Sequence, residues 1–154
     1  MSQLTADVSR KYKVSEDFRS EQPVAASTTI YAGSAVGKSS GYARQLTAGD
    51  VFLGFADAKA ANVADPNKPN FVVNGVTLGT AGAINVPVRE QGIVYITTIT
   101  GASGVVTNAG TKVYMSDGNT FTTSATGNTL IGEINCYRNG AFEVFFQTIA
   151  RRVG

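Results

Sequence analysis

The chain has 154 residues, which is enough for one domain with a sizeable hydrophobic core. It contains no histidine and one cysteine, which excludes a Ser-His-Asp or Cys-His catalytic group, a His and Cys zinc cluster and an intrachain disulfide. Its net charge of +2 does not indicate a nucleic-acid surface, and no apolar run approaches the roughly 20 residues of a membrane helix. Only 16% of the residues are charged, which favours a surface that other chains partly cover. We expect no enzyme activity, no cofactor, no metal, and neither nucleic acid nor membrane as a partner.

Residues 1–24 differ in composition from the rest of the chain. They contain no glycine, balance four basic against four acidic residues, and carry scattered apolar side chains at Leu4, Val8, Tyr12, Val14 and Phe18. One interpretation is a solvated tail, which is common at chain ends. We favour an arm that becomes ordered on a neighbouring subunit, because a solvated tail has no need of these apolar side chains. The segment is polar and of mixed charge, unlike a signal peptide.

Residues 25–150 are predicted to form a β domain. The first strand candidates in chain order are residues 27–31, 41–46 and 51–56. Gly54 lies inside the last of these and indicates a bulge or a close approach of two backbones.

Residues 57–83 are predicted to be an insertion made of a loop and a hairpin. Its start is rich in alanine, but the prolines of residues 65–70 follow at once, so we expect a short turn or an exposed loop there. Asn74 and Gly75 stand between two apolar runs and predict a small projecting hairpin.

Residues 84–88 alternate between apolar and polar side chains, which predicts another strand. Pro87 lacks an amide hydrogen, so it marks an edge strand or a strand end. We expect residues 89–92 to turn into the next strand.

The last third of the chain carries the strongest strand signal. Asp117-Gly118 and Asn139-Gly140 lie between apolar runs and predict hairpins, because type I′ turns need positive φ at both central residues. The runs are residues 92–100, 110–115, 130–134 and 141–147. The predicted fold class is all-β, as an antiparallel β-sandwich or a small partly open barrel with hairpins and an extended N-terminal arm. Residues 151–154 are predicted to be a short C-terminal tail, and we expect Arg151 and Arg152 either to be solvated or to pair with acidic groups of a partner.

Several motifs that suggest chemistry have simpler explanations. Residues 32–39 resemble a phosphate-binding P-loop, but only three residues separate Gly33 from Gly37 and no helix start follows. Asp117 begins a fragment of a calcium loop whose other ligands are missing. Glu133 and Glu143 lie on the two arms of one hairpin, but we expect them on the solvent face rather than as a catalytic pair.

The aromatic side chains near the C-terminus could form a stacking surface for sugars or bases. The simpler account places Phe142 and Phe146 in the core and Phe145 at a subunit contact on the opposite face. Cys136 is interpreted as a small apolar filler.

The order and spacing of these motifs resemble those of the head decoration, or capsid cement, proteins of tailed bacteriophages. The resemblance covers roughly residues 24–149, and no single motif is specific. It rests on Ala32-Gly33-Ser34-Ala35-Val36, Phe52-Leu53-Gly54-Phe55-Ala56, Val86-Pro87-Val88, Gly92-Ile93-Val94-Tyr95-Ile96, Ala109-Gly110-Thr111-Lys112-Val113-Tyr114, Leu130-Ile131-Gly132-Glu133-Ile134 and Val144-Phe145-Phe146. The sequence departs from the usual compact form in its long arm and in the 57–83 insertion.

The resemblance implies a small all-β protein, made in the host cytoplasm, that binds the outer surface of the mature capsid in the virion. It implies the major capsid protein as partner and a homo-oligomer, a trimer in preference to a dimer. An arm that reaches across a neighbour is frequent in such proteins. A receptor- or carbohydrate-binding β module is the alternative.

Overall fold

The computed structural model describes residues 3–13, 18–68, 71–73, 75–102 and 109–148. These residues contain no helix, so the all-β prediction is confirmed. The strands are β1 (Phe18–Pro23), β2 (Thr28–Ile30), β3 (Ala35–Ser39), β4 (Tyr42–Gln45), β5 (Val51–Ala56), β6 (Ala60–Asn62), β7 (Val72–Val73), β8 (Val76–Thr77), β9 (Asn85–Ile96), β10 (Lys112–Met115), β11 (Phe121–Thr122), β12 (Thr129–Arg138) and β13 (Ala141–Gln147).

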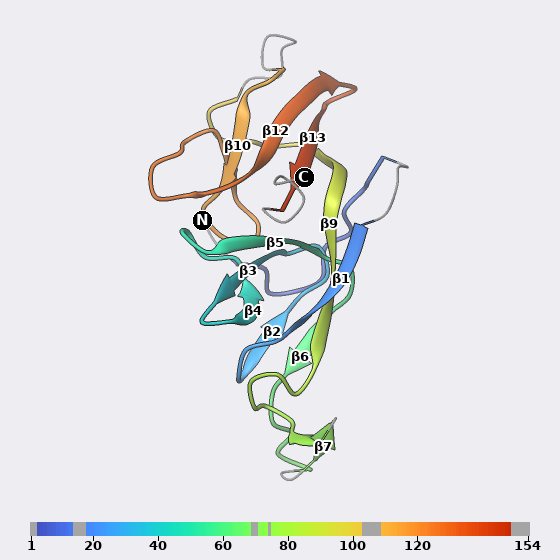
Figure 1. Cartoon of the computed structure of the whole chain (residues 1–154). Coiled ribbons are helices and arrows are strands. Elements are labelled where there is room, and N and C mark those ends of the chain that lie inside the picture. The colour runs from blue at the N-terminus through green and yellow to red at the C-terminus, as the bar shows by residue number, and fades with distance from the viewer. Residues whose placement is uncertain (1–2, 14–17, 69–70, 74, 103–108, 149–154) are drawn as a thin grey trace.

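One curled antiparallel sheet dominates the molecule, and it forms a half-barrel (Figure 1). Its strand order is β11-β10-β12-β13-β9-β5-β3-β4, and β1 pairs with β9 outside this path. Two small two-stranded sheets, β2-β6 and β7-β8, complete the described part of the chain. Of the two predicted architectures, the partly open barrel describes this arrangement and the sandwich does not.

The long strand β9 holds the two halves of the sheet together. Its second half pairs with β13, where Val144 lies opposite Val94, and its first half pairs with β5, where Ala56 lies opposite Val88. The prediction of a turn at residues 89–92 is therefore wrong, because these residues lie inside β9. The chain stays extended through residues 89–91, where the pairing with β1 shifts register, and the buried side chains Val86, Val88, Val94 and Ile96 lie on both sides of that irregularity.

Pro87 lies inside β9 rather than at an edge or a strand end, which corrects a second expectation. Its carbonyl accepts a hydrogen bond of 2.9 Å from the amide of Asp57, the residue that follows β5. Pro87 therefore lies just beyond the last residue pair between β5 and β9. Its missing amide hydrogen breaks no hydrogen bond of that pairing.

All three predicted hairpins are present. Asn139 and Gly140 have φ values of 53° and 79° between β12 and β13, as a type I′ turn requires. The β7–β8 hairpin projects at one end of the molecule, as expected (Figure 1). In the β10–β11 hairpin the amide of Ser116 donates to the Thr120 carbonyl over 3.3 Å, so its loop is longer than a two-residue turn.

The first part of the 57–83 insertion is a strand, not the turn or loop that we expected. β6 pairs with β2 and places Ala60 and Asn62 inside, with Ala61 outside. Asn62 is fully buried, donates to the carbonyls of Ala25 and Thr80 over 3.0 and 2.7 Å, and accepts from the amide of Gly79 over 2.9 Å. This one side chain therefore ties the two ends of the insertion to the body.

The hydrophobic core has two parts that meet along β9. The larger lies under β5, β9, β10, β12 and β13 and contains Phe52, Phe55 and Phe146, whose rings pack edge to face. The smaller contains Val24, Ile30 and Val36 with the first half of β9. Phe142 and Phe146 thus lie in the core as predicted, and Phe145 is half-buried on the other face.

Candidate interaction surface

The N-terminal segment, residues 3–13, lies on the body of its own chain. Leu4 is only 8% exposed, and its backbone amide and carbonyl both bond to the side chain of Gln45, over 3.1 and 3.0 Å. The amide of Val8 donates to the Ala32 carbonyl over 2.8 Å, and Tyr12 pairs with Val94 on the free edge of β9. The solvated-tail interpretation is therefore wrong for these residues.

Phe18 begins β1, which pairs with β9 from Gln91 to Asn85. Residues 18–23 therefore belong to the sheet, and the predicted boundary between arm and body at residue 24 is wrong. The sequence of β1, FRSEQP, shows no alternation of apolar side chains. The strand is held by its backbone pairing with β9, which does not require such a pattern. Partner binding by Leu4, Val8, Tyr12 and Phe18 stays a prediction, and Val14, Arg151 and Arg152 lie outside the described residues.

Gln3 joins two loops that are far apart in the sequence. Its side-chain amide donates to the Leu46 carbonyl over 2.7 Å, and its side-chain oxygen accepts from the Gly118 amide over 2.7 Å. Thr47 and Asp117 also form a β-bridge here. The start of the chain thus fastens the β4–β5 turn to the β10–β11 loop, where the two ends of the curled sheet approach each other.

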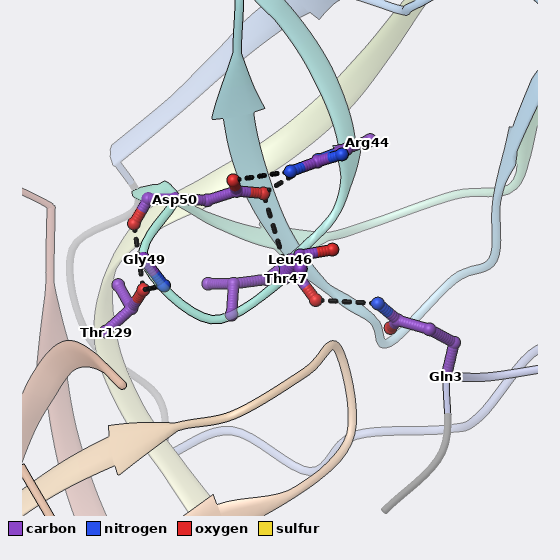
Figure 2. A network of polar contacts seen from close by, with 7 residues as sticks. All are labelled: Gln3, Arg44, Leu46, Thr47, Gly49, Asp50 and Thr129. Atoms are coloured by element: carbon purple, nitrogen blue, oxygen red, sulfur yellow. Dashed lines mark hydrogen bonds and ion pairs between the residues drawn. The ribbon is translucent and has the colours of Figure 1, made fainter. Parts of the chain in front are cut away.

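Figure 2 shows the polar network on the other side of that turn. Arg44 makes a two-point contact with Asp50 over 2.9 and 2.8 Å, and this hydrogen bond to Asp50 raises the pKa of Arg44. The hydroxyl of Thr129, at the start of β12, donates to the Asp50 carbonyl and accepts from the Gly49 amide, over 2.8 and 3.1 Å. The network fastens the β4–β5 turn to the start of β12.

Arg10 lies over the large core rather than in solvent. Its guanidinium donates to the Gly33 carbonyl over 2.8 Å and to Asn119 over 2.7 Å, and it lies 5.4 Å from the centre of the Phe121 ring. Burial lowers the pKa of Arg10. No pattern in the sequence distinguishes this arginine from the solvated charges beside it.

Tyr12 connects the segment to the core. Its ring lies 6.0 Å from the ring of Phe146, and the guanidinium of Arg89 stacks on it at 4.2 Å. Burial raises the pKa of Tyr12 to about 12. The predicted apolar anchor is thus part of the folded body.

Glu143 is 1% exposed, although it occupies the outer face of β13 where we expected a solvated side chain. Lys13 lies 3.4 Å and Arg138 3.1 Å from its two carboxylate oxygens, and the thiol of Cys136 donates to it. The alternation was predicted correctly, but the N-terminal segment and the β12–β13 hairpin cover the outer face. Cys136 is half-buried in this polar cluster and is not the apolar filler that we expected.

The hydrogen bond from Cys136, with Lys13 and Arg138, keeps the pKa of Glu143 below its usual value of 4.5 against the opposing effect of burial. Replacing Glu143 by Gln is expected to lower the free energy of unfolding by about 1 kcal/mol at neutral pH. The carboxylate's contribution is complete above the unfolded pKa and disappears as pH falls through the lowered folded pKa. Denaturant unfolding of both chains at about pH 7 and about pH 3 checks this. An equal difference between the two chains at both pH values would contradict it.

The β7–β8 hairpin projects at the end of the molecule farthest from β10 and β12 (Figure 1). Apolar side chains on it and beside it are exposed. Phe71 is 45% and Val72 55% exposed, and Val63 on the adjoining segment is 44% exposed. Lys68 lies 5.5 Å from the centre of the Phe71 ring. Large apolar side chains on a protruding hairpin are typical of a contact with another protein.

The motifs that suggested chemistry are part of ordinary turns and strands. Residues 35–39 of the P-loop-like stretch form β3, with no helix after it. The Asp117 carboxylate accepts from the amide of Asn119 and the hydroxyl of Thr120, over 2.9 and 3.0 Å, and so stabilises its own loop. Glu133 lies opposite Phe145, whereas Glu143 lies opposite Cys136. Within the described ranges, no three His, Cys, Asp or Glu side chains gather as a metal site would require.

Among the described residues there is no helix long and apolar enough to cross a membrane. Comparison with known proteins found no family model and no curated protein that matches this chain.

Proposed function

We propose that this chain is a capsid decoration protein. It binds the outside of a mature bacteriophage head and clamps neighbouring subunits of the major capsid protein. We propose further that it acts as a homo-oligomer, with a trimer favoured over a dimer.

The observation that carries the proposal is the ordered set of motifs in the sequence. Each motif corresponds to a strand of the one curled sheet or to the turn that begins it. They fall in the turn before β3, in β5, in the two halves of β9, in β10, in β12 and in β13. The all-β fold is the one that the resemblance implies. The motifs follow one another along the sequence at the same intervals as the strands in which they lie.

The proposed mechanism is mechanical and thermodynamic. A protein that binds the assembled lattice, and not the separate subunits, stabilises that lattice by mass action. Such a protein needs more than one contact with its partners. The apolar end of the β7–β8 hairpin, with Phe71 and Val72, offers one contact well away from the rest of the body. An interface of standard size buries about 1,200–2,000 Å², which several small contacts can supply together.

A carbohydrate-binding module is a weaker candidate. It depended on a surface made of the C-terminal aromatic side chains, and Phe142 and Phe146 are only 3% and 0% exposed. Tyr137 is also largely taken up by its contact with Phe142, whose ring centre lies 4.8 Å away.

Co-sedimentation with capsids tests the proposal. The purified chain is expected to bind expanded, undecorated heads of its phage saturably and to leave unexpanded procapsids unbound, because only the expanded lattice has the complete site. Procapsids are the matched control, since they carry the same capsid protein in another arrangement. Binding to neither form would overturn the proposal, and equal binding to both would overturn recognition of the mature lattice.

A further inference from the structure

We propose that a basic hollow on the outer face of the sheet binds carboxylate side chains of a partner protein. The basic hollow is an open depression of about 620 Å³ between the N-terminal segment and the β12–β13 hairpin, lined by Lys11, Lys13, Tyr95, Arg138 and Asn139 among others. The inference deepens the proposed function and rests on it, since it assigns an acidic segment of the capsid protein to this site.

The charges of the described residues at the basic hollow do not cancel. Three cations, Lys11, Lys13 and Arg138, surround it, and the only carboxylate among the described residues that they contact is Glu143. Glu143 lies beneath them with its side chain 2% exposed, and its lowered pKa keeps it charged. Among the described residues, the cluster therefore has a net charge of +2, counted as three positive charges and one negative.

Several hydrogen-bond donors remain available to a ligand. The side chains of Lys13 and Arg138 are 49% and 64% exposed although each contacts Glu143 on its inner side. Lys11 is exposed, and within the described residues no carboxylate pairs with it. A concave site lined by one sign of charge concentrates the potential and favours a ligand of the opposite sign. The charge complementarity thus points to an anion.

The dimensions favour protein carboxylates over nucleic acid. A nucleic-acid backbone needs a track of basic side chains that follows successive phosphates, together with stacking aromatics. Here the three cations are gathered at one compact depression, and the net charge of the whole chain is only +2. Tyr95 and Asn139 beside them suit an acidic peptide segment, which presents a carboxylate with apolar and amide groups on either side.

Titration with a short blocked oligoglutamate peptide, followed by amide NMR shifts, tests the site without any capsid. Shifts are expected at Lys11, Lys13 and the β12–β13 turn. At about 50 mM salt the affinity of Lys11→Glu is expected to fall about tenfold, because the electrostatic attraction is little screened. Lys38→Glu, the same change at an exposed lysine on β3, is the matched control and should bind as the original chain does. Lys11→Ala should show a smaller loss.

The outcomes separate this inference from the proposed function. Absence of localised shifts, or equal binding by Lys11→Glu, overturns the inference, and so does tighter binding of an oligothymidylate than of the peptide. Capsid binding is then compared for the same variants. If Lys11→Glu binds expanded capsids as well as Lys38→Glu does, the hollow is not the capsid contact and the inference fails while the proposed function stands. If the peptide binds as expected but no capsid binds, the proposed function fails and the carboxylate site remains.

Discussion

A chain that lacks residues 1–13 is expected to be less stable than the full chain by about 3–5 kcal/mol, a large part of the stability of a domain of this size. The segment buries Leu4 and packs the half-buried Tyr12 against the core, and fully burying a side chain of that size stabilises by about 1.5–3 kcal/mol. It also covers Phe55 and Phe121 with Arg10 and supplies the two bonds of Gln3. The conformational entropy of ordering the segment offsets part of this gain.

Denaturant unfolding of the truncated chain measures the effect, and a chain lacking only residues 1 and 2 is the matched control because it keeps every contact named here. The same experiment decides how the segment is used. An unchanged midpoint after removal of residues 1–13 would show that the body does not depend on them, which is what an arm reserved for a neighbouring subunit requires. A large loss would show that the segment completes its own body.

The sequence predicted the strands of the last third because each carries its own signal. Phe142, Val144 and Phe146 in β13 face inward at strand spacing, β12 is a β-branched run with buried Ile131 and Ile134, and Asn139-Gly140 determines the turn between the two strands. These are local patterns that need no knowledge of the rest of the fold. The β10–β11 loop shows the limit, because the Asp117 carboxylate stabilises a longer loop than its Asp-Gly pair indicates.

The missed features depend on partners that are distant in sequence. The continuity of β9 was visible as alternation on both sides of Glu90, but Gly92 and the charges beside it looked like a turn. β1 and the N-terminal segment carry no such pattern, because backbone pairing along an edge of β9 places them, and that pairing does not depend on apolar side chains. The covering of Glu143 by Lys13 and Arg138 could not be predicted either. The alternation within one strand shows on which face of the sheet a side chain lies, but not which other segments cover that face.

Gly54 was predicted to mark a bulge or a close backbone approach, and the structure has both. In the pairing of β3 with β5, Val36 lies opposite Gly54 and Gly37 opposite Phe52, so Leu53 is the extra residue. Gly54 has a φ of 122°, and a Cβ atom added to it would lie 2.9 Å from the backbone carbon of Arg89 and closer still to its carbonyl oxygen. No flexible side chain is involved, so nothing can yield without a movement of β9.

Replacing Gly54 by Ala is therefore expected to destabilise the protein by about 3–5 kcal/mol, or to prevent folding, which is at the extreme for a single substitution. The pairing of β5 with β9 consists of two residue pairs, Phe55 with Arg89 and Ala56 with Val88, and it joins the two halves of the sheet. A side chain at residue 54 would clash with the backbone of β9 at Arg89, next to these two residue pairs.

Gly127→Ala provides the matched control, because Gly127 also has a positive φ, 72°, but a Cβ atom there meets nothing within 4 Å. Its backbone strain alone should cost about 1–2 kcal/mol. The excess loss in Gly54→Ala, measured by denaturant unfolding of both variants, is then the contribution of the contact with β9. Equal losses in the two variants would mean that β5 and β9 are not in close contact at this joint, and the half-barrel would need another connection between its two halves.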